Sequence, residues 1–540
     1  MKKNIYKYAA FIGILTLASC EPEFDDPLED SPITEERGEA DFSKYVAVGA
    51  SITAGFGDGS LYIEGQEVGF PNIIATQMQA AGGGEFTIPF MADNIGGFAG
   101  IFEVDDEGAP TDEPTFATRL IIDAATESPV RANDNVSVND PGALISGLYN
   151  NIGIPGAKSF NAITNGYGAF NPYFGRMATS ADASMISDAV AQEPTFFSLW
   201  LGGNDVLSYA TSGGTGVDQF TAANDDDTTY GPDDITSLGA FDDALDESLD
   251  ALTANGASGV IFNVPTLSDL PFFTTVPNNA LVLDTEQAAN LTGFFQAYSG
   301  IFAGGVTLQL IEAGLDAATA SAQANALAAQ YAITFNEGPN RFLIATEPSQ
   351  INPQGFRQMT EDELLLLSID TAALSEQGYG SVVVTDEVEV VLGKLRMQLD
   401  ITPEEGLLVL NAINPIADED ALDITEINAI NTATNAYNES IADAANNNSN
   451  LMLFDANGLV SELRTDGLQF DGGSLFPVLG SAFSLDGIHL SPRGNAVFAN
   501  RVMEEMNAFF GSTLQPVNPL NFKTITLKEF EFSAQTDIDM

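Results

Sequence analysis

The stretch Tyr-Val-Ala-Val-Gly-Ala-Ser at residues 45–51 decides the fold. Four apolar residues in a row, closed by a glycine, are typical of a strand buried on both faces, as in a parallel sheet. Comparable runs lie at residues 195–201, 260–264 and 451–454, and a shorter candidate lies near residues 148–149. Their recurrence along the chain predicts one sheet of mostly parallel strands.

Helical periodicity fills the intervals between these runs. Residues 424–445 have a helical pattern, and Ser491 followed by Pro492 is a good helix start. One face is predicted for Phe241, Leu245, Leu249 and Leu252, and another for Phe498, Val502, Met506 and Phe509. The alternation predicts an α/β fold, a doubly wound, flavodoxin-like, mostly parallel sheet with helices on both faces.

Two long segments, at about residues 57–144 and 266–420, exceed what a minimal sheet requires. We expect both to be insertions in a single domain covering residues 42–511, with a C-terminal tail at residues 512–540. Between Glu286 and Glu312 no residue is charged. A lipid-facing lid and a buried helical hairpin both fit this segment, and its interspersed polar residues favour the hairpin.

The charge balance narrows the range of partners. The chain of 540 residues has 18 basic and 76 acidic residues, a net charge of −58, which repels phosphate backbones and argues against nucleic acid as a partner. Aspartates at positions 225–227 and 233–234 could bind calcium, but their spacing is not that of an EF-hand, and a solvated acidic loop is favoured. We expect no metal site.

The N-terminus has the pattern of a secreted protein. Two lysines precede a short apolar stretch, which predicts a signal peptide at residues 1–19. The end of this stretch, Leu-Ala-Ser-Cys, resembles a bacterial lipobox, which implies lipid attachment to Cys20, the only cysteine. An ordinary signal peptide with an incidental cysteine is the alternative.

Residues 20–41 are acidic and contain proline, as expected of a solvated tether behind the anchor. Acidic residues directly after the cysteine resemble the surface-export signal of Bacteroidetes lipoproteins. The resemblance implies a lipid-anchored protein of the bacterial cell envelope, at the outer membrane and exposed at the surface. A charged linker without such an address explains the same residues.

His489 is the only histidine, so any histidine-dependent proton transfer must use it. Asp486, three residues upstream, can accept the Nδ1 proton, which leaves Nε2 free to act as a base. Taken alone, this spacing also fits a polar histidine beside a helix cap.

Three further stretches place polar groups at strand ends, the ligand-binding edge of such sheets. Ser51 follows the first strand and is a candidate nucleophile, although Thr53 replaces the last glycine of the Gly-x-Ser-x-Gly elbow. Asn204, after Gly202-Gly203, and the N–H of Gly156 could both donate hydrogen bonds to an oxyanion. Each stretch alone also fits a plain turn.

Together and in this order, the four stretches resemble blocks I, II, III and V of the SGNH (GDSL-type) hydrolase family. The resemblance implies that Ser51 is the nucleophile, that His489 is the general base oriented by Asp486, and that Ser51, Gly156 and Asn204 form the oxyanion hole. It implies hydrolysis of a carboxylic ester of a lipid or an acylated carbohydrate through an acyl-enzyme, without a cofactor.

The sequence departs from the family in two respects. Ala50 stands where the family motif has aspartate, and the blocks lie farther apart than in compact members. These departures leave an alternative, a noncatalytic surface lipoprotein that uses its insertions to bind a glycan or a protein.

Overall fold

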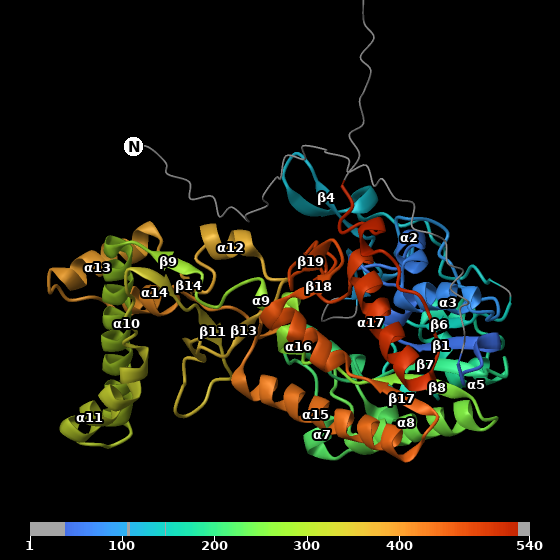
Figure 1. Ribbon diagram of the computed structural model, residues 1–540. Helices are drawn as coiled ribbons and strands as arrows, with labels where there is room; N and C mark the ends of the chain where they lie inside the picture. Colours follow the sequence, from blue (N-terminus) through green and yellow to red (C-terminus); the bar gives the residue numbers. More distant parts are fainter. Residues whose placement is uncertain (1–37, 105–108, 146, 528–540) are drawn as a thin grey trace, which may run out of the picture. The chain divides into compact units, whose positions relative to one another are not determined.

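The computed structural model describes residues 38–104, 109–145 and 147–527 of the chain (Figure 1). The predicted signal peptide, Cys20 and the tether up to residue 37 lie outside the described residues, as do residues 528–540 of the predicted tail.

A five-stranded parallel sheet forms the centre of the described chain. In spatial order its strands are β17 (Leu451–Phe454), β8 (Ser258–Phe262), β7 (Phe196–Trp200), β1 (Tyr45–Gly49) and β6 (Asn151–Gly153). The expectation of an α/β fold with a mostly parallel sheet is therefore confirmed.

The strand expected near residues 148–149 is β6, which begins only at Asn151. Residues just before it bond to Thr87 instead: its Oγ1 donates to the Leu148 carbonyl at 3.1 Å, and its carbonyl accepts the Asn150 N–H at 2.9 Å. The Asn150 carbonyl accepts the Ala47 N–H of β1 at 2.8 Å, and the Asn150 side chain donates to the Tyr45 carbonyl at 2.8 Å, so pairing with β1 starts only at this point of the chain.

Helices cover both faces of the sheet. Side chains alternate between the faces of a strand, and in β1 Val46 and Val48 lie in one hydrophobic cluster, whereas Tyr45 and Ala47 lie in another. The first cluster includes α5 (Met185–Val190), α8 (Leu238–Thr253) and α15 (Ile424–Asn447), and the second includes α3 (Phe70–Ala80) and α17 (Pro492–Phe510).

The predicted faces of these helices are confirmed except at one position. All four predicted residues of α8 are buried, and α17 is capped by Ser491 and begins at Pro492. The prediction for Phe509 is wrong, because this residue is 50% exposed. Phe510 is buried instead, and the centroids of its ring and the Phe196 ring lie 5.3 Å apart. The buried residues of this face are spaced four apart, which is slightly more than the roughly 3.6 residues of one helical turn. The buried face therefore shifts gradually around α17, and at its end Phe510 faces the sheet.

Between α3 and β6 the chain forms two antiparallel hairpins. The first consists of β2 (Phe102–Val104) and β3 (Pro110–Pro114), and the second of β4 (Leu120–Asp123) and β5 (Ser128–Arg131).

Between β8 and β17 a long segment has hydrophobic clusters of its own. Its main feature is α10 (Thr285–Glu312), which packs against α11 (Ala317–Ala328). The helical hairpin expected between Glu286 and Glu312 is wrong, because α10 runs through this whole segment as one helix. Burial is limited to one face of α10, since Phe295 is fully buried while Leu308 is 65% exposed. By length and composition alone, α10 is the one helix in the described part of the chain that could cross a membrane.

The remaining elements are short. The helices are α1 (Ser51–Ala54), α2 (Ile63–Glu67), α4 (Pro172–Gly175), α6 (Asn204–Thr211), α7 (Gln219–Ala222), α9 (Pro271–Thr274), α12 (Thr371–Glu376), α13 (Asp386–Arg396), α14 (Pro403–Leu410) and α16 (Ala456–Asp466). The strands pair two by two: β9 (Leu281–Leu283) with β10 (Gly338–Asn340), β11 (Leu343–Ala345) with β12 (Phe356–Gln358), β13 (Leu364–Leu365) with β16 (Ala421–Leu422), β14 (Ser381–Val382) with β15 (Ile413–Asn414), and β18 (Leu468–Phe470) with β19 (Gly473–Leu475).

Candidate active site

Ser51 lies just beyond the carboxyl end of β1, where the chain turns into α1. The turn requires a glycine at position 49, because a Cβ there would lie 2.3 Å from Thr53 Oγ1 and 2.7 Å from the Trp200 carbonyl oxygen. Helix α1 is only one turn long and is capped by Gly55, whose φ of +81° favours glycine. The tight turn leaves the Ser51 side chain at the edge of the sheet.

Ser51, His489 and Asp486 form a continuous hydrogen-bonded chain. His489 Nε2 lies 2.8 Å from Ser51 Oγ, and His489 Nδ1 lies 2.9 Å from Asp486 Oδ2. The loop carrying the last two residues leads directly into the cap of α17. Residues that are 438 positions apart in the sequence thus meet at one point.

Asp486 is largely shielded, with 11% of its side chain exposed, and is held as a carboxylate. Its Oδ1 accepts the backbone N–H groups of Ile488 and His489, each at 2.9 Å, and its Oδ2 accepts the Gly59 N–H at 2.8 Å in addition to His489 Nδ1. Burial alone would raise the pKa of this carboxyl, but the charge and hydrogen bond of His489 and these backbone donors outweigh it and hold the pKa well below its usual range.

Residues 56–62 hold the Asp486–His489 loop from one side. The ring of Phe56 packs against the imidazole of His489, with 4.8 Å between centroids. Asp58 accepts the Leu485 N–H and the Tyr62 hydroxyl, both at 2.9 Å. These supporting residues were not anticipated from the sequence, because nothing in the local pattern links them to a loop more than 420 positions away.

The long segment between β8 and β17 holds the same loop from another side. Phe272 donates its backbone N–H to the Gly487 carbonyl at 3.0 Å, and its own carbonyl accepts the Leu367 N–H at 2.9 Å. Gly487 has a φ of +74°, and a Cβ there would lie 2.8 Å from the Phe272 nitrogen. The second predicted insertion therefore contacts the candidate site directly.

The predicted oxyanion donors lie at the same edge of the sheet. Gly156 follows β6, which pairs with β1, and Asn204 begins α6 after β7, the other neighbour of β1. Asn204 Nδ2 donates to the Ala157 carbonyl at 2.9 Å, which fixes the amide and leaves its second N–H free to bind another acceptor. The backbone N–H groups of Ser51 and Gly156 have no acceptor among the described residues.

Asp205, next to Asn204, ties the two donor loops together. Its buried carboxylate accepts the Ser159 N–H at 2.9 Å and the Ser159 hydroxyl at 2.6 Å. Burial raises the pKa of Asp205, and the hydrogen bonds from Ser159 oppose that rise. From the sequence, Asp205 was interpreted only as part of a turn. The apolar residues on either side of this turn were the available signal that Asp205 is buried.

Two cavities adjoin these residues. The smaller, of about 80 Å³, is lined by Ser51, Asn204 and His489 together with apolar side chains, among them Ile52, Leu207, Val264, Leu267 and Ile488. The larger, of about 460 Å³, is lined by Phe56, Gly59 and Gly156 together with Arg131, Glu113, Phe116 and Tyr173.

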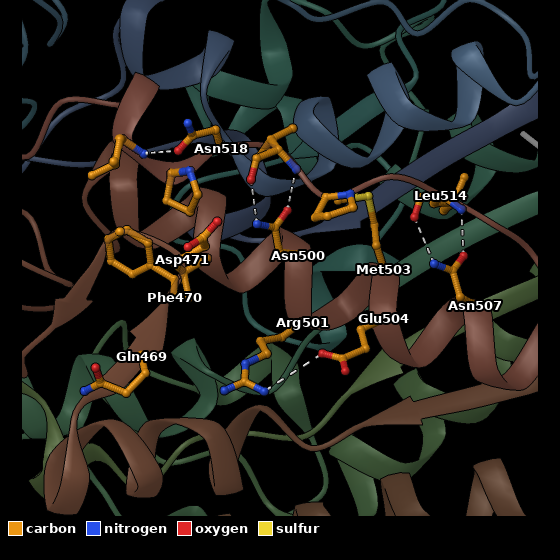
Figure 2. Close-up of a pocket in the computed structure, with 16 residues that line it drawn as sticks. Gln469, Phe470, Asp471, Asn500, Arg501, Met503, Glu504, Asn507, Leu514 and Asn518 are labelled. Carbon is orange, nitrogen blue, oxygen red and sulfur yellow. Dashed lines mark hydrogen bonds and ion pairs between the residues drawn. The ribbon is translucent and has the colours of Figure 1, made fainter. Parts of the chain in front are cut away.

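A third cavity, of about 770 Å³, lies along α17 and the segment at residues 514–520, and none of the predicted site residues lines it. Figure 2 shows that its asparagines are bound to the chain itself. Asn500 donates to the Val517 carbonyl and accepts the Val517 N–H, both at 2.8 Å, and Asn507 bonds to Leu514 in the same way. The arrangement fastens residues 514–520 to α17.

Within the described residues, no group of three or more histidine, cysteine, aspartate or glutamate side chains is arranged to hold a metal ion. The acidic loop considered for calcium uses Asp234 internally, since its carboxylate accepts the Val217 N–H at 2.8 Å, the Gly231 N–H at 2.9 Å and the Gln219 amide at 2.7 Å.

No protein-family model, curated protein or solved structure matches the chain. The geometry of the described residues brings Ser51, His489 and Asp486 into one hydrogen-bonded chain and places Asn204 and Gly156 on the neighbouring loops.

Proposed function

We propose that this chain is a serine ester hydrolase of the SGNH (GDSL) type. The observation that carries the proposal is the hydrogen-bonded chain from Ser51 Oγ through both ring nitrogens of His489 to the carboxylate of Asp486, with distances of 2.8 and 2.9 Å. This is the arrangement that activates a hydroxyl for attack on an acyl carbonyl.

In the acylation step, His489 Nε2 accepts the Ser51 proton while Oγ attacks the ester carbonyl carbon. Asp486 keeps Nδ1 protonated, which leaves Nε2 available as the base, and it stabilises the imidazolium that forms. The negative oxygen of the tetrahedral intermediate is bound by the Ser51 and Gly156 N–H groups and by the free N–H of the Asn204 amide. The imidazolium then protonates the leaving alcohol.

In the deacylation step, a water molecule takes the place of the alcohol. His489 accepts a proton from this water as it attacks the acyl-enzyme, and returns the proton to Ser51 Oγ when the carboxylic acid leaves. The same oxyanion donors serve both steps. These steps use only groups of the protein, and no cofactor enters the proposal.

The scaffold we propose is a doubly wound, flavodoxin-like sheet with two insertions. Numbered in chain order, the five strands have the spatial order 2-1-3-4-5, with the nucleophile at the end of the first, where such sheets bind ligands. The proposed insertions at about residues 57–144 and 266–420 supply Asp58, Gly59 and Phe272, which hold the Asp486–His489 loop.

We also propose that the enzyme is anchored in the bacterial cell envelope, at the outer membrane, through a lipid on Cys20. Support comes from the lipobox-like sequence before the only cysteine. Metabolic labelling with a palmitate analogue tests it: the full-length chain should incorporate the label and Cys20→Ser should not, while equal labelling would contradict the anchor.

A fluorophosphonate probe and p-nitrophenyl acetate test the proposed activity. The full chain should hydrolyse the ester and be labelled by the probe, and Ser51→Ala should lose both. Ser375→Ala, which removes an exposed serine on α12, serves as the matched control and should behave as the wild type. Equal labelling of Ser51→Ala, or a wild type that hydrolyses no ester, would overturn the proposal and favour the noncatalytic alternative.

A further inference from the structure

The 460 Å³ cavity adjoins the candidate site through Phe56 and Gly59, which contact its residues, and through Gly156, a proposed oxyanion donor. Phe56 packs against the His489 ring, Gly59 donates its N–H to Asp486, and Gly156 offers an N–H to the proposed oxyanion. All three line the cavity. A substrate held at Ser51 therefore has this cavity beside it.

Arg131, at the end of β5, supplies unused hydrogen-bond donors to this cavity. Its Nη1 donates to the Thr118 carbonyl at 2.6 Å and lies 3.0 Å from where a Cβ on Gly59 would be. Its remaining N–H groups have no acceptor among the described residues, and its side chain is only partly buried. An arginine fixed at one end, with free donors facing a cavity, is suited to binding a ligand oxygen.

The other side chains of the cavity match a neutral ligand better than an anion. Glu113 and Glu103 also line it, and the Asp486 carboxylate lies close enough to act on the charge of Arg131. An anion here would meet these carboxylates in a chain of net charge −58. A ligand with several hydroxyl groups can instead accept from the arginine and donate to the glutamates.

Aromatic rings complete the lining. Phe116 and Tyr173 meet edge to face with centroids 5.5 Å apart, and Phe56 lies on the side next to His489. A cavity that combines flat apolar rings with a few placed donors and acceptors suits a ring-shaped polar molecule, which has apolar C–H faces and hydroxyls at its rim.

The cavity at Ser51 has the opposite character. It measures about 80 Å³, and apart from the polar site residues and Thr53 its walls are mainly aliphatic and aromatic, so it suits a short acyl chain better than a hydroxylated group. The two cavities thus divide an ester into a small apolar acyl part and a larger polar alcohol part.

We propose that the substrate is a short-chain acyl ester of a neutral sugar, with the sugar bound in the 460 Å³ cavity by Arg131 and Glu113. This inference rests on the proposed esterase function and specifies its substrate class. Arg131 and Glu113 act as specificity residues, because they bind the alcohol part and do not contact the reacting carbonyl.

The test compares three acetyl esters on the full chain: an acetylated hexose, the matching acetylated hexuronic acid, and p-nitrophenyl acetate. The wild type should prefer the hexose ester to the hexuronic ester by about tenfold in kcat/KM. Arg131→Gln should lower the ratio of kcat/KM for the hexose ester to that for p-nitrophenyl acetate by about tenfold, the effect of one lost charged hydrogen bond. Glu113→Gln, at an exposed position where folding is not at risk, should lower the same ratio severalfold.

Arg501→Gln is the matched control, because Arg501 lines the unrelated cavity of Figure 2 and pairs there with Glu504 at 3.9 Å. It should leave the ratio unchanged. A wild type that cleaves p-nitrophenyl acetate but not the hexose ester, a preference for the hexuronic ester, or an unchanged ratio in both variants overturns the sugar subsite alone. A wild type that cleaves none of the three esters overturns the proposed function itself.

Discussion

The edge of the sheet at Ser51 and the cavity along α17 show that size does not mark the candidate site. The α17 cavity is the larger, at about 770 Å³, yet its asparagines are satisfied by the backbone of residues 514–520. At the sheet edge, by contrast, the Ser51 and Gly156 N–H groups have no acceptor among the described residues. Unpaired donors beside a candidate nucleophile point to chemistry, whereas paired donors indicate a structural role.

The contrast is tested most strongly at Asp486. In Asp486→Asn the amide would donate to Nδ1 and move the imidazole proton to Nε2, so His489 could no longer accept the Ser51 proton. We expect kcat for p-nitrophenyl acetate to fall by about 10⁴-fold. The measurement is a steady-state assay with the folded state checked by circular dichroism.

If kcat fell by less than about tenfold in Asp486→Asn, the carboxylate would only stabilise the loop, as the asparagines of α17 stabilise residues 514–520. The corresponding change in the other cavity, Asn500→Asp, should leave kcat within about twofold, since that cavity takes no part in the reaction.

A second, smaller effect is expected at Asn204. Asn204→Ala removes one proposed oxyanion donor, and kcat should fall by about 10²- to 10³-fold while KM changes much less, because the bond forms chiefly in the transition state. Asn325→Ala, on the exposed face of α11, is the control and should have no effect. If the loss appeared mainly in KM, Asn204 would be a ground-state binding residue instead.

Some strands of the sheet were easier to predict from the sequence than others. The strands were predictable because parallel strands buried on both faces are continuous apolar runs, as at residues 45–48 and 451–454. The predicted position of β6 was a few residues too early, because the strand is only three residues long and begins with a polar residue, Asn151. The Asn151 side chain donates to the Thr53 carbonyl at 2.8 Å.

The site divides in the same way. Ser51, Asn204, Asp486 and His489 follow strand ends or precede a helix cap, positions that local patterns reveal. Gly59 could not be found in this manner, since its bond to Asp486 joins residues 427 positions apart and depends on how a long connection folds back. Sequence patterns of this kind identify candidate reactive residues but not the backbone that holds them.

The cavity along α17 should give a change in stability without a change in rate. Asn507 bonds to the Leu514 N–H and carbonyl at 2.8 and 2.9 Å and to the Ser512 hydroxyl at 2.8 Å. We expect Asn507→Ala to lower the free energy of unfolding by about 1–2 kcal/mol and to leave kcat/KM within about twofold. Denaturant titration and the ester assay measure the two quantities.

Glu504→Gln is the control for the same cavity, because its 3.9 Å ion pair with Arg501 is largely exposed and contributes little. A marked loss of activity in Asn507→Ala, with the fold intact, would contradict a purely structural role of the α17 cavity.

The smallest expected effect is a difference in how stability depends on pH between variants at the sheet edge and variants at the α17 cavity. The folded-state pKa of Asp486 is held below that of an unfolded aspartate, about 3.9, so its ionised form stabilises the folded protein above about pH 4, and this contribution is lost as the pH falls toward the folded pKa. The difference in unfolding free energy between the wild type and Asp486→Asn should shrink by about 1 kcal/mol between pH 4 and 3. For Asn507→Ala, which removes no titrating group, the corresponding difference should stay flat over the same range. If the Asp486→Asn difference were flat as well, the carboxylate would have no stabilising charge interaction with His489 and the loop donors, and the electrostatic basis of the proposed base would fail.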